Sequence, residues 1–376
     1  MEFTVNKSDL VRELNLSQGV VEKKTTIPIL SNILLEASGD RLTLTATDLE
    51  LGIRCSCPAK VKKAGAGTLP ARKLLDYVRL LPDADLDVKI QDNHWASIVC
   101  GRSRTKIAGM SRESFPELPA MPEELAQMPL GVLAAMISKT IFAISAEESR
   151  FTLNGALLLL KSNGMTMVST DGHRLSMIEG DIELPTMGAT YRALLSRKAM
   201  SEILKLAGDT NGEAIVHFSG DDNHLFFKIG ERLLLSRKLT GNFPDFERVL
   251  PKEHPQFISL DRDELRAAIE RVSQFSDERS RAVRLRFASG ELQIHSSLSE
   301  TGESEEALPS DYTGETVQIG FNAGYMLDFL RAIAEKQVSF YFRDPNSAGE
   351  MRPVKADADG AAVHYNYRYV VMPMRI

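Results

Sequence analysis

The sequence predicts an α+β fold made of three tandem copies of one domain, each about 125 residues long. A strand-like segment with alternating apolar and polar residues, Leu42–Asp48, recurs at Met165–Asp171 and more weakly at Leu292–Ser297. A turn of Phe, Pro and an acid occurs at Phe115–Glu117 and again at Phe243–Asp245. Each recurrence lies 123 to 128 positions after its predecessor, which is close to one third of the 376 residues. We number the copies 1 to 3 along the chain.

Each copy is expected to contain two helices. The first helices are expected at Ser8–Gln18, Leu130–Ser145 and Arg262–Phe275, and the second helices at Ala71–Leu81, Ser196–Leu206 and Ala323–Ile333. In the third copy, Leu265, Ala268, Ile269 and Val272 follow the spacing of one helical face. Asp261 precedes this helix as its predicted N-cap.

Strand-like segments fill the intervals between the helices, for example Ala214–Phe218 and Val283–Phe287. Their alternation predicts antiparallel sheets with helices on one face, and exposed sheet edges would allow one copy to continue the sheet of the next. Proline-rich segments at positions 116–129 and 244–255 read as stiff connections. The predicted domains are therefore residues 1–120, 128–250 and 256–376.

The composition excludes several classes of protein. The content of 43% hydrophobic and 26% charged residues is typical of a globular chain. A net charge of −6 argues against binding nucleic acid by bulk positive charge, although it permits a locally basic surface. Three cysteines do not form a disulfide framework, and the sequence begins without a signal-peptide pattern, so we expect a cytoplasmic protein.

The chain has few signs of catalysis. It contains no Gly-x-x-x-x-Gly-Lys-Ser/Thr phosphate loop, and its seven histidines are scattered, so we expect no cofactor and no metal. One alternative is a hydrolase that uses Asp171 and His173 with Ser169 or Ser176. Residues so close in sequence rarely form a triad, and the chain has no Gly-x-Ser-x-Gly elbow.

Several motifs together resemble the bacterial sliding clamp family, the beta subunit of DNA polymerase III. They are Thr170-Asp-Gly-His-Arg-Leu175, Leu69-Pro-Ala-Arg-Lys73, the Phe243-Pro-Asp245 turn with Arg248-Val-Leu-Pro251, and the C-terminal Tyr369-Val-Val-Met-Pro-Met-Arg-Ile376. The resemblance covers the whole chain. It implies three DNA-clamp domains, with helices on the inner face and antiparallel sheets on the outer face of a head-to-tail dimeric ring.

The resemblance also implies the function. Such a ring is a non-catalytic processivity factor that encircles double-stranded DNA without reading its sequence. Its implied protein partners are a second copy of the chain, the polymerase III catalytic subunit, the clamp-loader complex and other proteins with a clamp-binding motif; no membrane is involved. A peptide-binding repeat scaffold without DNA is a further alternative.

Basic residues are concentrated on the expected inner helices, for example in Ala71–Leu81 and Tyr191–Ala207. Contacts of such residues with phosphates are weak and independent of sequence, which suits a ring that slides. The DNA-binding residues implied by the resemblance are Lys24, Arg72, Arg150, Arg197, Lys198, Asn322 and Tyr325. Taken without the resemblance, these residues would be read as ordinary solvated helix faces.

A hydrophobic cleft for short linear peptides is implied near the end of the chain. Leu, Val and Met side chains suit apolar peptide residues, and Met adapts to different ligands. The matching positions are Leu153, Thr170, Gly172, His173, Arg174, Leu175, Pro244, Val249, Val370, Val371, Met372, Pro373, Met374, Arg375 and Ile376. The alternative is that Val370–Ile376 is only a terminal core strand; a mixed arrangement would have Val370 and Val371 pack inward while the cleft is lined from Met372 onward.

Opposite charges mark the implied dimer interface, with basic residues in copy 1 and acidic residues in copy 3. The predicted interface residues are Arg102, Arg104, Lys106, Ile107, Phe275, Glu300, Glu303, Glu305 and Glu306. The alternative is that Gly302–Glu306 is a solvated acidic loop. Gln274 departs from the family pattern, which favours two apolar residues at positions 274 and 275.

Overall fold

A computed structural model of the chain describes residues 1–21, 26–147, 149–210, 213–252, 255–298, 302–354 and 364–375. Within these residues, each third of the chain contains eight strands and two α-helices in the same order. The prediction of three tandem α+β copies is therefore confirmed. The predicted site residues Lys24, Glu300 and Ile376 lie outside the described residues.

The bounds of the elements show the repetition. Copy 1 consists of β1 (Glu2–Asn6), α1 (Lys7–Ser17), β2 (Asn32–Ser38), β3 (Arg41–Thr47), β4 (Leu51–Lys63), β5 (Gly65–Pro70), α2 (Ala71–Leu80), β6 (Asp85–Ile90), β7 (Trp95–Cys100) and β8 (Ser103–Ala108). Copy 2 consists of β9 (Ala126–Pro129), α3 (Leu130–Ser138), β10 (Gly155–Lys161), β11 (Gly164–Thr170), β12 (Arg174–Gly180), β13 (Tyr191–Ser196), α4 (Arg197–Asp209), β14 (Ile215–Gly220), β15 (His224–Ile229) and β16 (Arg232–Arg237). Copy 3 consists of β17 (Gln256–Asp261), α5 (Arg262–Val272), β18 (Ala282–Ala288), β19 (Glu291–Leu298), β20 (Gly302–Pro309), β21 (Val317–Asn322), α6 (Ala323–Ala332), β22 (Gln337–Phe342), β23 (Gly349–Val354) and β24 (Tyr365–Val371).

The chain forms two compact units, and copy 2 is divided between them. The first unit holds Met1–Ala134 and Lys198–Lys238, and the second holds Ala135–Arg197 and the chain from Leu239 onward. In the first unit, β4 of copy 1 pairs antiparallel with β16 of copy 2, with Gly52 opposite Leu235. In the second unit, β12 of copy 2 pairs with β24 of copy 3, with Leu175 opposite Val370. Neighbouring copies therefore share continuous sheets, as the sequence predicted.

Of the fourth and eighth strands of the three copies, two have no partner in another copy within the described residues, and we call these two the open edges. β8 of copy 1 pairs only with β7, and β20 of copy 3 pairs only with β19. Gly302–Glu306 thus belongs to a regular strand, and the alternative of an acidic loop is wrong. The register of β20 with β19 sets these acidic side chains alternately on the two faces of the sheet.

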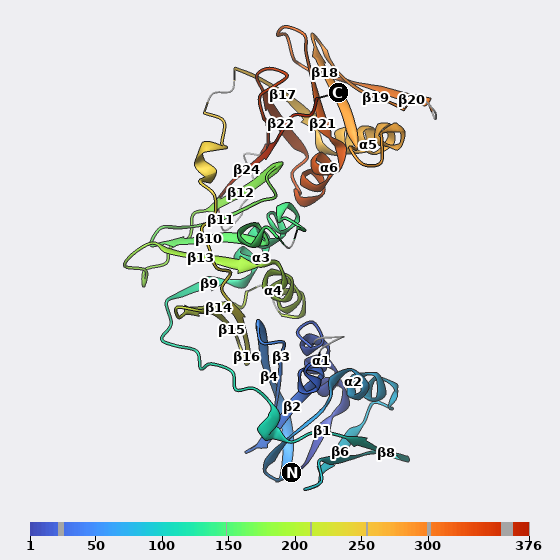
Figure 1. Cartoon of the computed structure of the whole chain (residues 1–376), viewed down its shortest axis with the longest axis vertical. Helices are drawn as coiled ribbons and strands as arrows, with labels where there is room; N and C mark the ends of the chain where they lie inside the picture. The colour runs from blue at the N-terminus through green and yellow to red at the C-terminus, as the bar shows by residue number, and fades with distance from the viewer. Residues whose placement is uncertain are drawn as a thin grey trace. The chain divides into compact units, whose positions relative to one another are not determined.

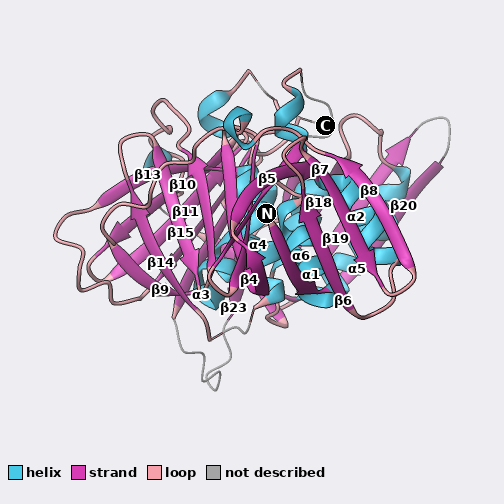
Figure 2. Ribbon diagram, turned by 90° about the horizontal axis from the view of Figure 1, so that it is seen from below, coloured by secondary structure: helices cyan, strands magenta, loops and turns pink. Residues whose placement is uncertain are grey.

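The helices lie in pairs against the strands. Helix α1 packs beside α2 and against β3 and β4, while α5 packs beside α6 and against β19 and β20 (Figures 1 and 2). The N-cap prediction for α5 is confirmed, because the Asp261 carboxylate accepts the backbone N–H groups of Asp263 and Glu264.

The first helix of copy 2 differs from the expectation. It was expected to reach Ser145, but α3 ends at Ser138 and a short 3₁₀ turn follows at Ile141–Ala143. The Thr140 hydroxyl donates to the carbonyl oxygens of Met136 and Ile137, 2.9 and 3.3 Å away. Such side-chain bonding competes with continued helical hydrogen bonding and is typical of the end of a helix.

Candidate functional site

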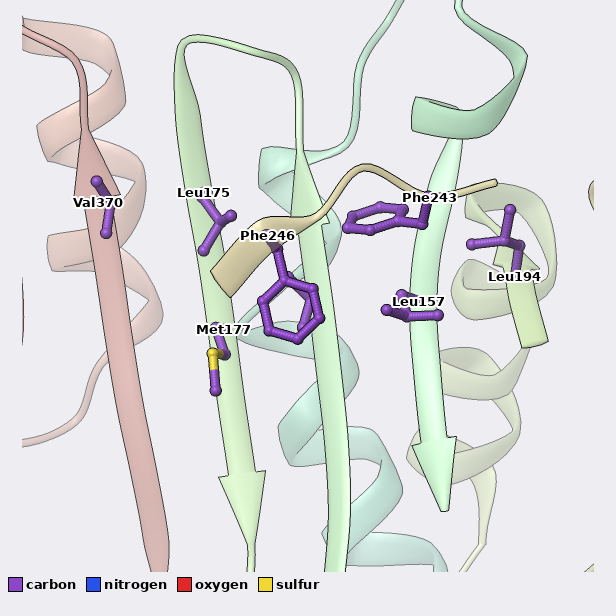
Figure 3. Close-up of a cluster of buried hydrophobic side chains, with 8 residues drawn as sticks. Leu157, Leu175, Met177, Leu194, Phe243, Phe246 and Val370 are labelled. Carbon is purple, nitrogen blue, oxygen red and sulfur yellow. The ribbon is translucent and has the colours of Figure 1, made fainter. Parts of the chain in front are cut away.

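An apolar cluster lies where the end of copy 2 crosses its own sheet. Phe243 and Phe246, on the segment after β16, point toward Leu157, Leu175 and Met177 on β10 and β12 (Figure 3). The buried members of the cluster are Leu157, Val168, Leu175, Met177, Leu194, Phe243, Phe246 and Val370. Leu153, Val249, Leu250 and Ala348 pack against it while remaining partly exposed. The cluster is therefore the floor of an apolar surface.

A cavity of about 530 Å³ opens beside Val249. It is lined by Arg248, Val249, Leu250, Pro251, Lys252, Phe342, Arg343, Ser347 and Ala348. Of these residues, the sequence predicted only Val249 as a site residue. The Arg248-Val-Leu-Pro251 motif was a signal for its neighbours, but residues 342–348 turn between β22 and β23 and carry no local pattern that points to the cleft.

The loop between β11 and β12 adjoins the apolar cluster, because Leu175, the second residue of β12, is a buried member of the cluster; we call Gly172–Leu175 the wall of the cleft. Its Thr170 hydroxyl donates to the Arg174 carbonyl oxygen over 2.6 Å, and Gly172 adopts a φ of 89°, which favours glycine. The backbone N–H of Met372 donates to the His173 carbonyl oxygen over 2.9 Å. The structure therefore brings the predicted loop and the end of the chain together.

The two valines of β24 have different roles. Val370 belongs to the apolar cluster beside Leu175 (Figure 3), whereas Val371 points to the opposite face of the strand. Both are fully buried, so the interpretation of a terminal core strand holds for these two residues. Met372 is 36% exposed and follows the last residue of the strand. The expected inward packing is therefore correct for both valines, and Val370 is in addition a member of the apolar cluster.

The hydrolase alternative has no support in this loop. The Ser169 and Ser176 hydroxyls donate to the carbonyl oxygens of Thr140 and Lys139, each over 2.6 Å, and both serines are buried. The Asp171 carboxylate accepts the backbone N–H groups of His173 and Arg174 and also the Arg174 guanidinium. These groups stabilise a turn and do not form a nucleophile with its base.

The predicted DNA-binding residues have varied environments. Arg72 is exposed on α2, with its guanidinium 3.8 Å from the Asp76 carboxylate. Lys198 forms an ion pair with Asp48, a nearly buried carboxylate of copy 1. Arg197 donates to the Ile144 carbonyl oxygen over 3.1 Å, and burial together with the charge of Arg174 lowers the pKa of Arg197.

Two further members of this set, Arg150 and Tyr325, contact the loop after β11. Arg150 donates to the Asp171 carbonyl oxygen over 2.9 Å and pairs with Glu147. Asn322 caps α6 by accepting the Tyr325 backbone N–H. The Tyr325 ring stacks on the His173 ring, with centroids 6.5 Å apart. The structure thus places Arg150 and Tyr325 beside the cleft loop.

Six of the nine predicted interface residues lie on β8 or β20. Arg104 and Lys106 are exposed on β8, and Glu303 and Glu305 are exposed on β20. Arg102 occupies the turn before β8, and Ile107 is buried in the core of copy 1. Glu306 lies on the helix side of β20, where its carboxylate accepts hydrogen bonds from Nε and Nη2 of Arg271. Only the outward-facing charges are therefore available to a partner.

Comparisons with known proteins agree with this architecture. The family model described as the DNA polymerase III beta subunit, N-terminal domain, matches residues 1–119; the central-domain and C-terminal-domain models match residues 127–245 and 247–375. The chain belongs to the DNA polymerase III beta subunit family. A beta sliding clamp of Pseudomonas aeruginosa is 35% identical over the full length of both chains, and one of Chlamydia muridarum is 32% identical over 100% of this chain and 99% of its own.

Solved structures of this family have the same fold. The DNA polymerase III subunit beta of Pseudomonas aeruginosa superposes with a TM-score of 0.92 at 34% identity, covering both chains fully. The sliding clamp of Bacillus subtilis reaches the same TM-score at 26% identity, covering 100% of this chain and 99% of its own. Within the residues that the structure describes, no helix is long and apolar enough to cross a membrane, and no cluster of His, Cys, Asp and Glu could hold a metal ion.

Proposed function

We propose that two copies of this chain close head to tail around duplex DNA and tether the replicative polymerase as a sliding clamp. The family consists of non-catalytic processivity factors, so retention on DNA comes from encirclement and not from a chemical step. The partners are double-stranded DNA, the polymerase III catalytic subunit, the clamp loader and other clamp-binding proteins, in the cytoplasm. We retain 1–120, 128–250 and 256–376 as the domain limits.

The observation that carries this proposal is the position of the two open edges in the repeat. Inside the chain, the fourth strand of one copy always pairs with the eighth strand of the next: β4 with β16, and β12 with β24. The strands left open are β20, the fourth of copy 3, and β8, the eighth of copy 1. The same pairing between two chains would therefore repeat an existing joint, and two such contacts would close a ring.

The internal joints also specify the register. The hairpins that lead into β8 and β16 have the same two-residue turn with a left-handed glycine. Counted from this turn, Lys106 of β8 is at the position equivalent to Leu235 of β16. In the preceding hairpins, Glu303 of β20 pairs with Ser297 and Gly52 of β4 pairs with Thr47. Glu303 is therefore at the position in β20 that is equivalent to Gly52 in β4. Since Leu235 pairs with Gly52, we propose that Lys106 lies opposite Glu303 of the partner, and Arg104 opposite Glu305.

This register opposes a basic side chain to an acidic one twice on the same sheet face, an arrangement that favours pairing. We propose to test it with a Lys106→Cys, Glu303→Cys chain under mild oxidation. Opposite residues in antiparallel strands have Cβ atoms about 5 Å apart, so a disulfide between protomers is expected. The control is Lys106→Cys, Glu305→Cys, in which the thiols are one diagonal step apart; equal cross-linking of the two variants would contradict the register.

The native thiols do not interfere with this test. Cys55, Cys57 and Cys100 are buried and free. Burial raises the pKa of Cys57 to about 12 and raises that of Cys55 further, so both remain protonated at neutral pH.

Encirclement itself is tested by topology. The protein is loaded by a clamp loader and ATP onto a nicked DNA circle, and the circle is then cut. We expect the clamp to leave the linear DNA while remaining on the intact circle. Equal retention on both forms would show ordinary attachment to DNA.

The proposal also includes the DNA-facing residues, among which Arg72 is best placed because it is exposed on α2. The proposed residues are Lys24, Arg72, Arg150, Arg197, Lys198, Asn322 and Tyr325.

We further propose that the apolar cluster and the cavity beside Val249 bind linear peptides of the polymerase and other clients. Deletion of residues 372–376 removes the segment after β24, which begins with the exposed Met372, while leaving the buried pair Val370 and Val371 in β24. The truncated clamp should remain dimeric in sedimentation but lose binding of the polymerase III catalytic subunit. Binding at the strength of the full chain would refute the peptide assignment.

A further inference from the structure

The guanidinium of Arg174 links the cleft loop to helix α6 of copy 3. Its Nη1 donates to the Asp328 carboxylate over 2.6 Å, its Nη2 to the Phe142 carbonyl oxygen over 2.6 Å, and its Nε to the Asp171 carboxylate over 3.1 Å. The guanidinium carbon also lies 4.4 Å from the centre of the Tyr325 ring, one turn before Asp328 on α6. The group thus spans two copies of the domain within one unit.

This arginine is directed into the protein. Its side chain is 9% exposed, and each of its three nitrogens has a protein acceptor. Burial alone would lower the pKa of Arg174, but the contacts with Tyr369, Asp328 and Asp171 outweigh this effect and raise it. The guanidinium is therefore always charged, and its function in the cleft depends on the groups that hold it.

We infer that Asp328 is a positioning residue for the peptide cleft: through Arg174 it sets the position of the Gly172–Leu175 wall. Arg174 begins β12, His173 accepts the backbone N–H of Met372, and Leu175 is part of the cleft floor. A shift of Arg174 would thus move the wall, the floor and the attachment of the chain's end together. The inference rests on the proposed peptide-binding function of this cleft.

Copy 2 contains a matched position that separates this role from general stability. Glu202 is the sixth residue of α4, as Asp328 is the sixth residue of α6. Glu202 is 3% exposed, lies against Gly19 of copy 1 and pairs with Lys205 over 2.6 Å. Both acids therefore support a junction between copies, but only Asp328 binds a residue of the cleft loop.

The test measures binding of the purified polymerase III catalytic subunit to immobilised full-length clamp. Asp328→Asn keeps the size of the side chain and removes the charge that holds Arg174, and we expect the affinity to fall about tenfold. Asp328→Glu should retain most of the binding. Glu202→Gln should lower the thermal midpoint while leaving the affinity within about twofold, because Glu202 belongs to the first compact unit and the cleft residues belong to the second.

A double-mutant cycle provides the readout that a purely structural role would not produce. In an Arg174→Met background, Asp328→Asn should cause no further loss of affinity, because the link is already broken. Unchanged affinity of Asp328→Asn, an equal loss in Glu202→Gln, or additive losses in the double variant would each overturn the inference. If the parent clamp fails to bind the subunit, or binds it without residues 372–376, the proposed cleft fails instead. If Asp328→Asn is not dimeric in sedimentation, the cycle is repeated with Asp328→Glu in its place. The affinity of Asp328→Glu for the polymerase subunit is then compared with that of the parent, with and without Arg174→Met, and this comparison decides whether Asp328 acts through Arg174.

Discussion

The junction between copies 1 and 2 and the two open ends of the chain are built from equivalent strands. At the junction, which we call closed, β4 pairs with β16; at the open ends, the equivalent strands β20 and β8 have no partner in another copy. At the closed junction, Leu233 and Leu235 of β16 face Arg54 and Gly52 of β4. At the open ends, the corresponding residues of β8 are Arg104 and Lys106. The closed strand is therefore apolar where the open strand is charged.

The helices show the same contrast. Val20, three residues after the end of α1, is fully buried, whereas Phe275, three residues after the end of α5, is only half-buried. Leu206, the tenth residue of α4, is 1% exposed, whereas Leu80, the tenth residue of α2, is 86% exposed. A surface that must be soluble before assembly carries charge and keeps its apolar residues few, and complementary charges then fix the direction of pairing.

The closed junction also contains a buried ion pair that the open ends lack in the corresponding places. Glu13 of α1 is 1% exposed and accepts two hydrogen bonds from Arg232 of β16, 2.8 and 3.0 Å long. We expect Glu13→Gln to lower the free energy of unfolding by about 1.5–3 kcal/mol, because Arg232 would lose one of its two carboxylate partners and keep Asp209, 2.7 Å away. Urea unfolding followed by circular dichroism measures this change.

The exposed carboxylate Glu305 is the matched control for Glu13. Glu305→Gln should change the free energy of unfolding of the monomer by less than about 0.5 kcal/mol.

Titration gives a second check. Burial alone would raise the pKa of Glu13, but hydrogen bonds from Arg232 and Arg12 outweigh it, so the pKa lies below its ordinary value of 4.5. The pair therefore stabilises the fold fully above pH 4.5 and loses its effect as the pH falls through the folded-state pKa. A Glu13→Gln variant with unchanged acid sensitivity would contradict this account.

The open ends predict a smaller effect that is confined to assembly. Arg104→Glu would place two carboxylates opposite each other in the proposed register, and we expect the dimer dissociation constant to rise at least tenfold in sedimentation. The free energy of unfolding of the monomer should stay within about 0.5 kcal/mol, because Arg104 is exposed.

Charge reversal on the partner strand sharpens this prediction. Combining Arg104→Glu with Glu305→Arg should restore the dimer, whereas combining it with Glu306→Arg should not, because Glu306 points to Arg271 within its own copy. Restoration by Glu306→Arg and not by Glu305→Arg would exclude the proposed register.

Much of this fold was readable from the sequence, because the repeat and the helical faces are local patterns. The start of α5 and the Asp261 cap followed from spacing and capping chemistry, whereas the α-helix ends at Val272 and a 3₁₀ turn covers Ser273–Phe275 of the expected range. The short α3 could not be predicted, since it ends through the hydroxyl of Thr140, a residue that helices also tolerate in their interior.

The site was predictable only in part for a similar reason. The loop at Thr170–Leu175 and the C-terminal segment carry recognisable motifs, but the partners of their side chains come from distant segments. Arg174 looked like a group facing the ligand and is instead held by Asp328. Lys198 looked like a phosphate contact and is paired with Asp48, 150 positions away. Sequence spacing gives residue type and local face, whereas tertiary ion pairs depend on how copies meet.

The smallest expected effect concerns Leu80, whose side chain is 86% exposed although the tenth position of α4 is buried. If ring closure repeats the internal junction, the partner covers Leu80 near the end of its α5, where Phe275 is half-buried. Leu80→Ser should then weaken the dimer by about 1–2 kcal/mol, the transfer free energy of a partly buried leucine side chain, while leaving the folded monomer unchanged. Dilution experiments on Leu80→Ser, with the exposed Arg79→Ser as the neighbouring control, measure it. A dimer as resistant to dilution as the parent would show that α2 stays in solvent, and that the junction between chains consists of the paired strands alone.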